Sequence, residues 1–305
     1  MSERLPGLVV LQAGVQSSMQ DLGRFGMAGQ GVSQGGSMDL HAHCWANRLL
    51  GNNANDATIE LAVGMAKIRA ESDLQLAITG AEMLAELDGS PVGNWCSFPI
   101  KRGQVLSLKA ARSGMRAYLA VAGGFLLDKQ FGSVSAVARN QLGKVLQEGD
   151  VLCARGVGAC MSRQVPSRFV PRYDDAIELR VIESYQISQF TPEQLKSFYA
   201  ASFTLTPDID RMGARLEGAG VVAPEVGIIS EGIALGAIQI PPDGQPIILL
   251  NDRQTLGGYP KLGCVARVDL PKLVQARPGA GVKFVPVTLS DACSEWREFC
   301  DYFAI

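Results

Sequence analysis

Short apolar runs at close spacing constrain the fold of this chain more than any other feature. Residues 74–78 alternate Leu or Ile with other residues, and Asp88-Gly89 is a dipeptide typical of a tight hairpin. Further short runs follow at 105–108 and 117–122. Because only one early helix accompanies them, these strands indicate a β-barrel or sandwich rather than alternating strand–helix units. We therefore predict a mainly-β fold.

The chain is long enough for two such folds, with 305 residues of which 47% are hydrophobic and 19% charged. The apolar pattern is lost between residues 155 and 175, where prolines and arginines collect, and strand-like runs then resume. We predict an N-terminal β-rich domain over residues 1–160, a linker over 161–175 and a C-terminal β-barrel domain over 176–305.

A few short helices interrupt the strands. The strongest prediction spans residues 38–50, with Ser37 as N-cap and Gly51 as the stop. Shorter helices are expected after Thr191 and over 269–276.

The first helix also suggests an anion site. Gly35, Gly36 and Ser37 would present backbone amides at its N-terminus, where a carboxylate or phosphate is attracted. An ordinary capped helix is the alternative.

Charge and cysteine content narrow the class of protein. A net charge of −2 gives no broad reason to bind nucleic acid or an anionic membrane. No apolar run approaches the roughly 18 residues of a membrane helix, and we expect a cytoplasmic protein. The seven cysteines are scattered and never form a Cys-x-x-Cys pair, which argues against a metal cluster or a disulfide framework. We expect no metal site in this chain.

Most standard catalytic motifs are absent or incomplete. Ser33 lies in a Gly-x-Ser-x-Gly sequence, but the only histidines, His41 and His43, follow it directly on the predicted helix. A serine hydrolase of that kind needs a histidine from later in the chain. There is no Gly-x-x-x-x-Gly-Lys-Ser/Thr loop for nucleotide phosphates.

Polar, glycine-rich loops are what remain as candidate sites. The most conspicuous is 251–260, Asn-Asp-Arg-Gln-Thr-Leu-Gly-Gly-Tyr-Pro, directly after an apolar strand. Its glycines permit close approach of a ligand and its polar residues offer charge and hydrogen bonds, although a tight turn is the simpler reading. Asp21 and Arg24 lie in another such loop, where a surface ion pair is the alternative to a site. The loops suit a small polar or anionic substrate.

Ordered sequence blocks resemble a known family over nearly the whole chain. They are Gln20-Asp21-Leu22-Gly23-Arg24, Gly36-Ser37-Met38-Asp39, Ala46-Asn47-Arg48-Leu49-Leu50-Gly51-Asn52, Glu60, Arg211-Met212-Gly213, Arg215-Leu216-Glu217-Gly218, Ser230-Glu231-Gly232, Gln239, Asp252-Arg253-Gln254-Thr255-Leu256-Gly257-Gly258-Tyr259-Pro260 and Gln275-Ala276-Arg277-Pro278-Gly279. The family is called allophanate hydrolase subunit 2, biotin-dependent carboxyltransferase domain, KipA-like, or 5-oxoprolinase C subunit.

The resemblance implies two β-barrel-like domains of cyclophilin-like type. It implies the C subunit of an ATP-dependent 5-oxoprolinase, which opens the cyclic amide 5-oxo-L-proline to L-glutamate together with an A subunit, as well as a KipI-like B subunit. ATP with magnesium would serve the complex as a whole. The alternatives are a biotin-dependent carboxyltransferase acting on urea or a related amide, and a KipA-like regulator that antagonises a kinase inhibitor. No biotin-carrier Met-Lys-Met segment is present, which favours the first.

The chain departs from the family pattern at Phe25, Ala136 and Ala214, where the resemblance leads us to expect proline, threonine and tyrosine. The last two changes put substrate contacts in doubt. Our hypothesis places a substrate carboxylate near Arg24 or the amides before Met38, and the amide being activated near Gln254, Thr255 and Tyr259. The expected catalytic residues are Asp21, Arg24, Asp39, Gln254 and Tyr259. The expected substrate-binding residues are Gln20, Gly36, Ser37, Ser133, Arg211, Ser230, Glu231, Thr255, Gly257 and Gly258.

Overall fold

The computed structural model describes residues 5–155, 161–174, 176–222 and 229–305. The chain divides into two compact units. The first, here called the sandwich unit, comprises Met1–Arg24, Gly35–Asp174 and Ile305. The second, here called the barrel unit, comprises Phe25–Gln34 and Asp175–Ala304.

These units differ from the expected domains 1–160 and 176–305 at two places. Residues 25–34 belong to the barrel unit, where Ser33 donates to the Arg253 carbonyl at 3.2 Å. Residues 161–174, expected as a linker, belong to the sandwich unit, where the Val165 amide donates to the Trp95 carbonyl at 2.9 Å. Hydrogen bonds to distant strands, which sequence patterns do not reveal, decide both assignments.

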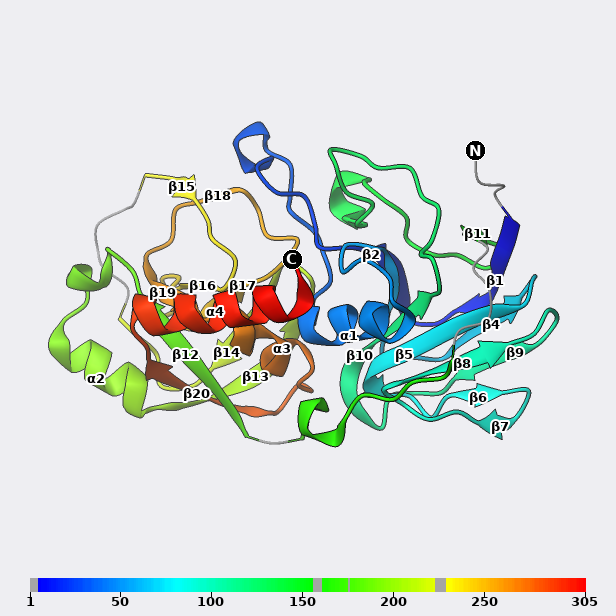
Figure 1. Ribbon diagram of the computed structural model, residues 1–305. Helices are drawn as coiled ribbons and strands as arrows, with labels where there is room; N and C mark the ends of the chain where they lie inside the picture. Colours follow the sequence, from blue (N-terminus) through cyan, green and yellow to red (C-terminus); the bar gives the residue numbers. More distant parts are fainter. Residues whose placement is uncertain (1–4, 156–160, 175, 223–228) are drawn as a thin grey trace. The chain divides into compact units, whose positions relative to one another are not determined.

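The sandwich unit contains two antiparallel sheets (Figure 1). In spatial order, the first consists of Val151–Ala154 (β11), Leu5–Ala13 (β1), Ala66–Ala70 (β4), Val105–Leu108 (β9), Glu86–Leu87 (β6) and Ser90–Pro91 (β7). The second consists of Gln16–Gln20 (β2), Thr58–Ala62 (β3), Ser113–Val121 (β10), Leu74–Glu82 (β5) and Cys96–Ile100 (β8). The Asp88-Gly89 hairpin is confirmed between β6 and β7, and both of its residues have positive φ, as a type I′ turn requires.

One hydrophobic core draws on both sheets. Leu8 and Ile68 enter it from the first sheet, and Ile78 and Leu119 from the second. The opposite face of β5 and β10 is covered by helix α1, Leu40–Leu50, where Thr79 donates to the Ala42 carbonyl at 2.7 Å (Figure 1). Because both faces of these strands are buried, residues 117–122 read as a continuous apolar run.

The barrel unit is a closed seven-stranded barrel. Its strands, in order around the barrel, are Ile177–Glu183 (β12), Lys261–Val265 (β19), Ala237–Gln239 (β16), Ile247–Leu249 (β17), Gly213–Glu217 (β14), Ser202–Ile209 (β13) and Gly281–Pro286 (β20). Only the closing pair, β12 with β20, is parallel among the described strand pairs of the barrel. A separate two-stranded ribbon joins Glu231–Gly232 (β15) to Leu256–Gly257 (β18). The mainly-β fold class is therefore confirmed.

Helices cover the barrel. Pro192–Ala200 (α2) packs against β20 and begins with a capping box between Thr191 and Gln194, so the helix predicted there is confirmed (Figure 1). The helix predicted over 269–276 is Leu270–Val274 (α3). A fourth helix, Leu289–Phe303 (α4), was not predicted. The 3₁₀ turns are Ala28–Gln30 (η1), Ala138–Asn140 (η2), Ser167–Phe169 (η3), Ile187–Gln189 (η4) and Arg267–Asp269 (η5).

Candidate functional site

Asp21 is the centre of a polar cluster in the sandwich unit. Its buried carboxylate accepts hydrogen bonds from the Ser133 hydroxyl at 2.6 Å, the Ser135 hydroxyl at 2.5 Å, and the amides of Val134 and Gly23 at 2.9 Å each. The two loops predicted as candidate sites around residues 21 and 133 therefore come together.

These contacts decide the chemistry of Asp21. Burial alone would raise the pKa of its carboxyl, but the hydroxyls of Ser133 and Ser135 and the amides of Val134 and Gly23 outweigh it and hold that pKa below its usual value. A carboxylate that accepts four hydrogen bonds and resists protonation is a poor base. The geometry favours a structural acceptor over the predicted proton-transfer role.

The neighbouring polar residues are also engaged in the framework. Arg24 is buried, and its Nε donates to the Gln130 carbonyl at 3.1 Å. The Gln20 amide donates to Ser18 Oγ at 2.9 Å and to the Ala136 carbonyl at 3.1 Å. Gly36 has positive φ, and a Cβ there would lie 2.9 Å from the Leu22 carbonyl oxygen, which only glycine avoids.

The N-terminus of α1 corrects the predicted start of the helix. The N-cap is Asp39, whose Oδ1 accepts from the Ala42 amide at 2.9 Å, so the helix begins at Leu40 and Ser37 is not its cap. Of the three amides expected to bind an anion, that of Ser37 donates to the Asp21 carbonyl at 2.9 Å. The next two amides, of Met38 and Asp39, donate to Glu60 Oε2 and Tyr118 Oη at 2.8 and 2.7 Å.

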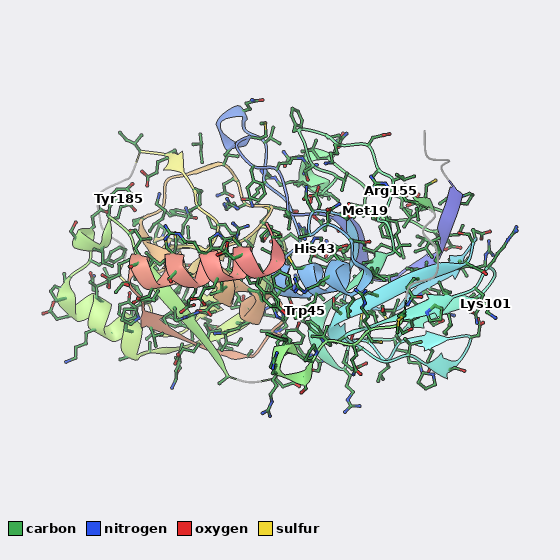
Figure 2. The ribbon with its side chains drawn as sticks, viewed as in Figure 1. Met19, His43, Trp45, Lys101, Arg155 and Tyr185 are labelled. Carbon is green, nitrogen blue, oxygen red and sulfur yellow. The ribbon has the colours of Figure 1, made fainter. Side chains whose placement is uncertain are left out.

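Ser37 and His43, of which Figure 2 labels His43, form a buried pair at α1. His43 Nε2 lies 2.8 Å from the Ala54 carbonyl and therefore donates, which leaves Nδ1 as the acceptor for Ser37 Oγ at 2.8 Å. Burial lowers the pKa of His43, so the ring is neutral at pH 7. This hydrogen bond holds helix α1 to the loop before it, and the substrate contact expected of Ser37 stays a prediction.

In the barrel unit, most of the predicted second-half residues gather at the β15–β18 ribbon. Glu231 pairs with Gly257 across it, and the Ile233 amide donates to the Thr255 carbonyl at 3.2 Å. Ser230 is exposed and Tyr259 is 45% exposed. Gln254 and Gly258 are half-buried on the same loop.

Glu231 is held by a donor set from the barrel. Its carboxylate accepts from Lys261 Nζ, from Tyr185 Oη and, at 2.8 Å, from Gln186 Nε2 (Figure 2 labels Tyr185). The Gln186 side-chain oxygen accepts from the Lys261 amide at 2.8 Å, which fixes the orientation of this side chain. The hydrogen bond from Lys261, followed by that from Tyr185, holds the pKa of Glu231 below its usual value, and the pKa of Tyr185 is raised by Glu231.

Gln239 lies beside this donor set. It is the cross-strand partner of Lys261, and its side chain is 2% exposed. Its Nε2 has no hydrogen-bond partner among the residues that the structure describes. The group points at Gly257, where an added Cβ would lie 2.9 Å from Nε2.

Arg253 carries a half-buried charge. Its guanidinium donates to the carbonyls of Ile233 and Leu250 at 3.0 and 3.2 Å, and to Gln34 Oε1 at 3.1 Å. No carboxylate in the described part of the chain forms an ion pair with it. Burial, followed by the charge of Arg267, lowers its pKa to about 10. Arg253 still carries its proton at neutral pH and adds positive charge to this region.

Arg211 forms an ion pair with Asp252, at the start of the 251–260 loop. Its Nε and Nη2 donate to the two carboxylate oxygens of Asp252, both at 3.0 Å, and both side chains are buried. This two-point ion pair fixes the loop after β17. It gives Arg211 a structural role, and the predicted substrate contact stays a prediction.

The three departures from the family pattern lie in different environments. Ala214 is fully buried in β14, and Ala136 is buried with its carbonyl bonded to Gln20. Phe25 is 57% exposed, and the Arg267 guanidinium lies 5.9 Å from its ring centre.

The described residues contain no candidate metal centre, because no group of three or more His, Cys, Asp or Glu among them could hold an ion. None of the described helices has the length and apolarity to cross a membrane. A cavity of about 770 Å³ in the sandwich unit is lined by residues such as Glu82, Asn94 and Arg172, and no predicted site residue lines it.

Three residues that lie near Glu231 or Gly257 of the ribbon were not predicted as site residues. They are Gln186, Lys261 and Gln239. Gln239 and Arg253 belong to the blocks that carry the family resemblance, which was a usable signal. Gln186 and Lys261 have no such signal, because their contacts with Glu231 depend on where the separate β15–β18 ribbon meets the barrel.

The closed barrel, the two-sheet unit and the polar ribbon are consistent with one family, and sequence comparison identifies it. Residues 30–286 match the family described as carboxyltransferase domain, subdomain A and B. The chain therefore belongs to the carboxyltransferase domain family.

Individual relatives extend this match. The chain is 33% identical to the 5-oxoprolinase C subunit of Escherichia coli (strain K12), over 97% of this chain and 96% of that protein. It is 35% identical to the 5-oxoprolinase C subunit of Haemophilus influenzae, over 95% of this chain and 94% of that protein. The crystal structure of Kluyveromyces lactis urea amidolyase has a TM-score of 0.87 and 26% identity over 99% of this chain, which spans only 20% of that much longer protein.

Proposed function

We propose that this chain is the C subunit of an ATP-dependent 5-oxoprolinase, which opens 5-oxo-L-proline to L-glutamate in a complex with B and A subunits. The reaction adds water across a cyclic amide bond, so the complex is a hydrolase. A cytoplasmic location is part of the same proposal.

The observation that carries this proposal is the extent of the likeness to proteins of that name. Two bacterial 5-oxoprolinase C subunits align with this chain over nearly the full length of both partners. The urea amidolyase structure aligns through only a fifth of its length. The relatives are named as subunits, which supports assembly with partners.

The barrel unit offers the groups that this chemistry needs. Tyr259 and Gln254 have side chains that can donate hydrogen bonds to the oxygen of an amide, and both are accessible at the ribbon. Arg253 supplies positive charge for an anionic substrate. In the sandwich unit, Asp21, Arg24 and Asp39 hold loops in place.

We place ATP and magnesium at the level of the complex. The sequence has no phosphate-binding Gly-x-x-x-x-Gly-Lys-Ser/Thr loop, and the described residues include no acidic cluster suited to a metal ion. Biotin belongs only to the alternative function.

Co-expression with the B and A subunits of the same organism tests the proposal. The purified complex should hydrolyse ATP only when 5-oxoproline is present and should release glutamate, and both activities should disappear when this chain is omitted. Tyr259→Phe should lower turnover by at least about tenfold if the phenol acts in the transition state, equivalent to about 1.4 kcal/mol. Tyr302→Phe is a matched control. An intact complex without activity on 5-oxoproline would refute the proposal.

The alternative with specific support is biotin-dependent carboxyl transfer to urea or a related amide. It rests on the match to the carboxyltransferase family and on the high structural similarity to the urea amidolyase structure. Urea-dependent consumption of carboxybiotin by the chain would favour it. No observation on the described residues specifically favours the KipA-like regulatory function.

A further inference from the structure

We propose that Lys261 and Gln186 bind the carboxylate of a small substrate while Gln239 donates to a second acceptor of the same substrate, and that Glu231 occupies the carboxylate position as an internal stand-in until the substrate displaces it. The inference rests on the proposed function for the identity of the substrate, 5-oxo-L-proline. The site itself is argued from the barrel unit alone.

The first observation is that the donors are built into the barrel while the acceptor is not. Lys261 begins β19, its side chain is 9% exposed, and Gln186 is 2% exposed. Gln186 is oriented by the Lys261 amide at 2.8 Å. Glu231 comes from the ribbon, in a strand of two residues, and its side chain is 33% exposed. A rigid donor set therefore faces a carboxylate on a small, separate element.

The second observation is Gln239. Its buried Nε2 is a hydrogen-bond donor without an acceptor in the described residues, and it lies across the strand pair from Lys261. Glu231 satisfies Lys261 and Gln186 but not Gln239. Buried polar groups are normally paired. The unpaired Nε2 therefore indicates a ligand that brings an additional acceptor, which the carboxylate of Glu231 does not supply. The lactam carbonyl of 5-oxoproline is such an acceptor.

The third observation is the surrounding charge. Burial raises the pKa of the Cys264 thiol, and the positive charges of Lys261 and Arg253 both work to lower it. Both cations are therefore close enough to influence the same thiol. Only Lys261 of these two cations has a carboxylate partner in the described residues. The region retains positive charge when Glu231 is in place and gains more when it leaves, which favours an incoming anion.

Gly257 and Ile233 explain why the ribbon must move. An added Cβ at Gly257 would lie 2.4 Å from Ile233 Cδ1 and 2.9 Å from Gln239 Nε2, so the ribbon lies directly over the unpaired amide. A substrate reaches Gln239 only when the β15–β18 pairing lifts. The same step withdraws Glu231 from Lys261, which couples opening of the ribbon to exchange of one carboxylate for another.

The competing explanation is that Lys261 and Glu231 form an ordinary structural ion pair. Substitution of Glu231 distinguishes this explanation from a displaceable stand-in. A tethered carboxylate competes at an effective concentration on the order of millimolar. Glu231→Gln removes the competing charge, so it should tighten binding of 5-oxoproline to the full chain by at least about tenfold, as removal of a closed state requires. A structural pair predicts no gain.

The experiment is a binding titration in which each probe is added to the full chain, alone and within its complex, and binding is monitored by ligand-detected NMR. The probes are 5-oxo-L-proline, 2-pyrrolidinone as the same ring without a carboxylate, and inorganic phosphate. The matched control is Glu86→Gln, which removes the carboxylate of the exposed Lys109–Glu86 pair. Lys261→Met should abolish binding, and Glu231→Gln should speed hydrogen exchange at the Ile233 amide.

Each outcome decides the proposal. Tighter binding of 5-oxoproline in Glu231→Gln, unchanged in Glu86→Gln and absent for 2-pyrrolidinone, supports it. Equal affinity in all variants, or no binding even in Glu231→Gln, overturns it, as does phosphate binding that matches 5-oxoproline. Since the assay needs neither ATP nor turnover, an inactive complex with this binding pattern refutes the proposed function and leaves the site intact.

Discussion

Replacement of Asp21 by Asn tests whether this residue is a structural acceptor. The Asp21 carboxylate accepts four hydrogen bonds, three of them at Oδ1 and one at Oδ2. If the Asn oxygen keeps the Oδ1 bonds, its NH₂ group faces the Val134 amide and leaves that buried donor unpaired, at a cost of about 1–3 kcal/mol.

The remaining three bonds lose their charge assistance, roughly 1 kcal/mol each, while removal of the buried charge relieves part of its desolvation cost. We therefore expect Asp21→Asn to lower the free energy of unfolding of the sandwich unit by about 3 kcal/mol. For a unit of this size, that corresponds to a fall in Tm of about 6–12 °C.

The assay is thermal and urea denaturation followed by tryptophan fluorescence. Trp45 and Trp95 lie in the sandwich unit and Trp296 in the barrel unit, so a Trp296→Phe background reports on the sandwich unit alone. The control is Asp73→Asn, whose carboxylate accepts one exposed hydrogen bond from the Arg102 amide. A loss below about 1 kcal/mol in Asp21→Asn, no larger than in the control, would refute the structural role.

The remaining predictions concern the same buried groups. The pKa of the Asp21 carboxyl is lower in the folded state than in the unfolded state, where it is about 4. The ionised carboxyl therefore contributes its full stabilisation above that unfolded pKa and loses it as pH falls through the folded pKa. The free energy of unfolding of the wild type should fall more steeply than that of Asp21→Asn between about pH 5 and pH 2. Asp252→Ala leaves Arg211 buried without its ion pair and should cost about 3–5 kcal/mol in the barrel unit, whereas Asp243→Ala, at the exposed pair with Arg215, should cost less than about 1 in the same urea denaturation. Gln239→Leu should leave stability unchanged or raise it by about 1 kcal/mol while it weakens 5-oxoproline binding, and a loss of stability would show that its amide is paired.

Local patterns predicted the strands, the Asp88-Gly89 hairpin and the stop of α1 at Gly51, because these depend on alternation and on positive φ. The start of α1 was displaced because Ser37 and Asp39 are both capable caps, and tertiary contacts to His43 and Tyr118 decide between them. Helix α4 was overlooked although Ala292, Trp296 and Phe303 follow helical spacing after the Thr288 cap.

Candidate site residues were harder to predict because a charged residue in a loop can either bind a ligand or hold the loop through internal hydrogen bonds. Asp21 and Arg211 were chosen for their charge, and the structure shows both committed to internal hydrogen bonds. Glu231 was also chosen, but its partner Lys261 is distant in sequence and is brought near only by the tertiary fold, where the ribbon meets the barrel. The polar residues of glycine-rich loops drew attention to the β15–β18 ribbon, but residue type alone did not separate side chains with structural partners from those accessible to a ligand.

The most direct test of the account is 5-oxoproline-dependent ATP hydrolysis by the complex of this chain with its B and A subunits, measured together with glutamate release. We predict that both activities appear in equal amounts and are lost when this chain is left out. An intact three-subunit complex that neither hydrolyses ATP in response to 5-oxoproline nor releases glutamate would contradict the account.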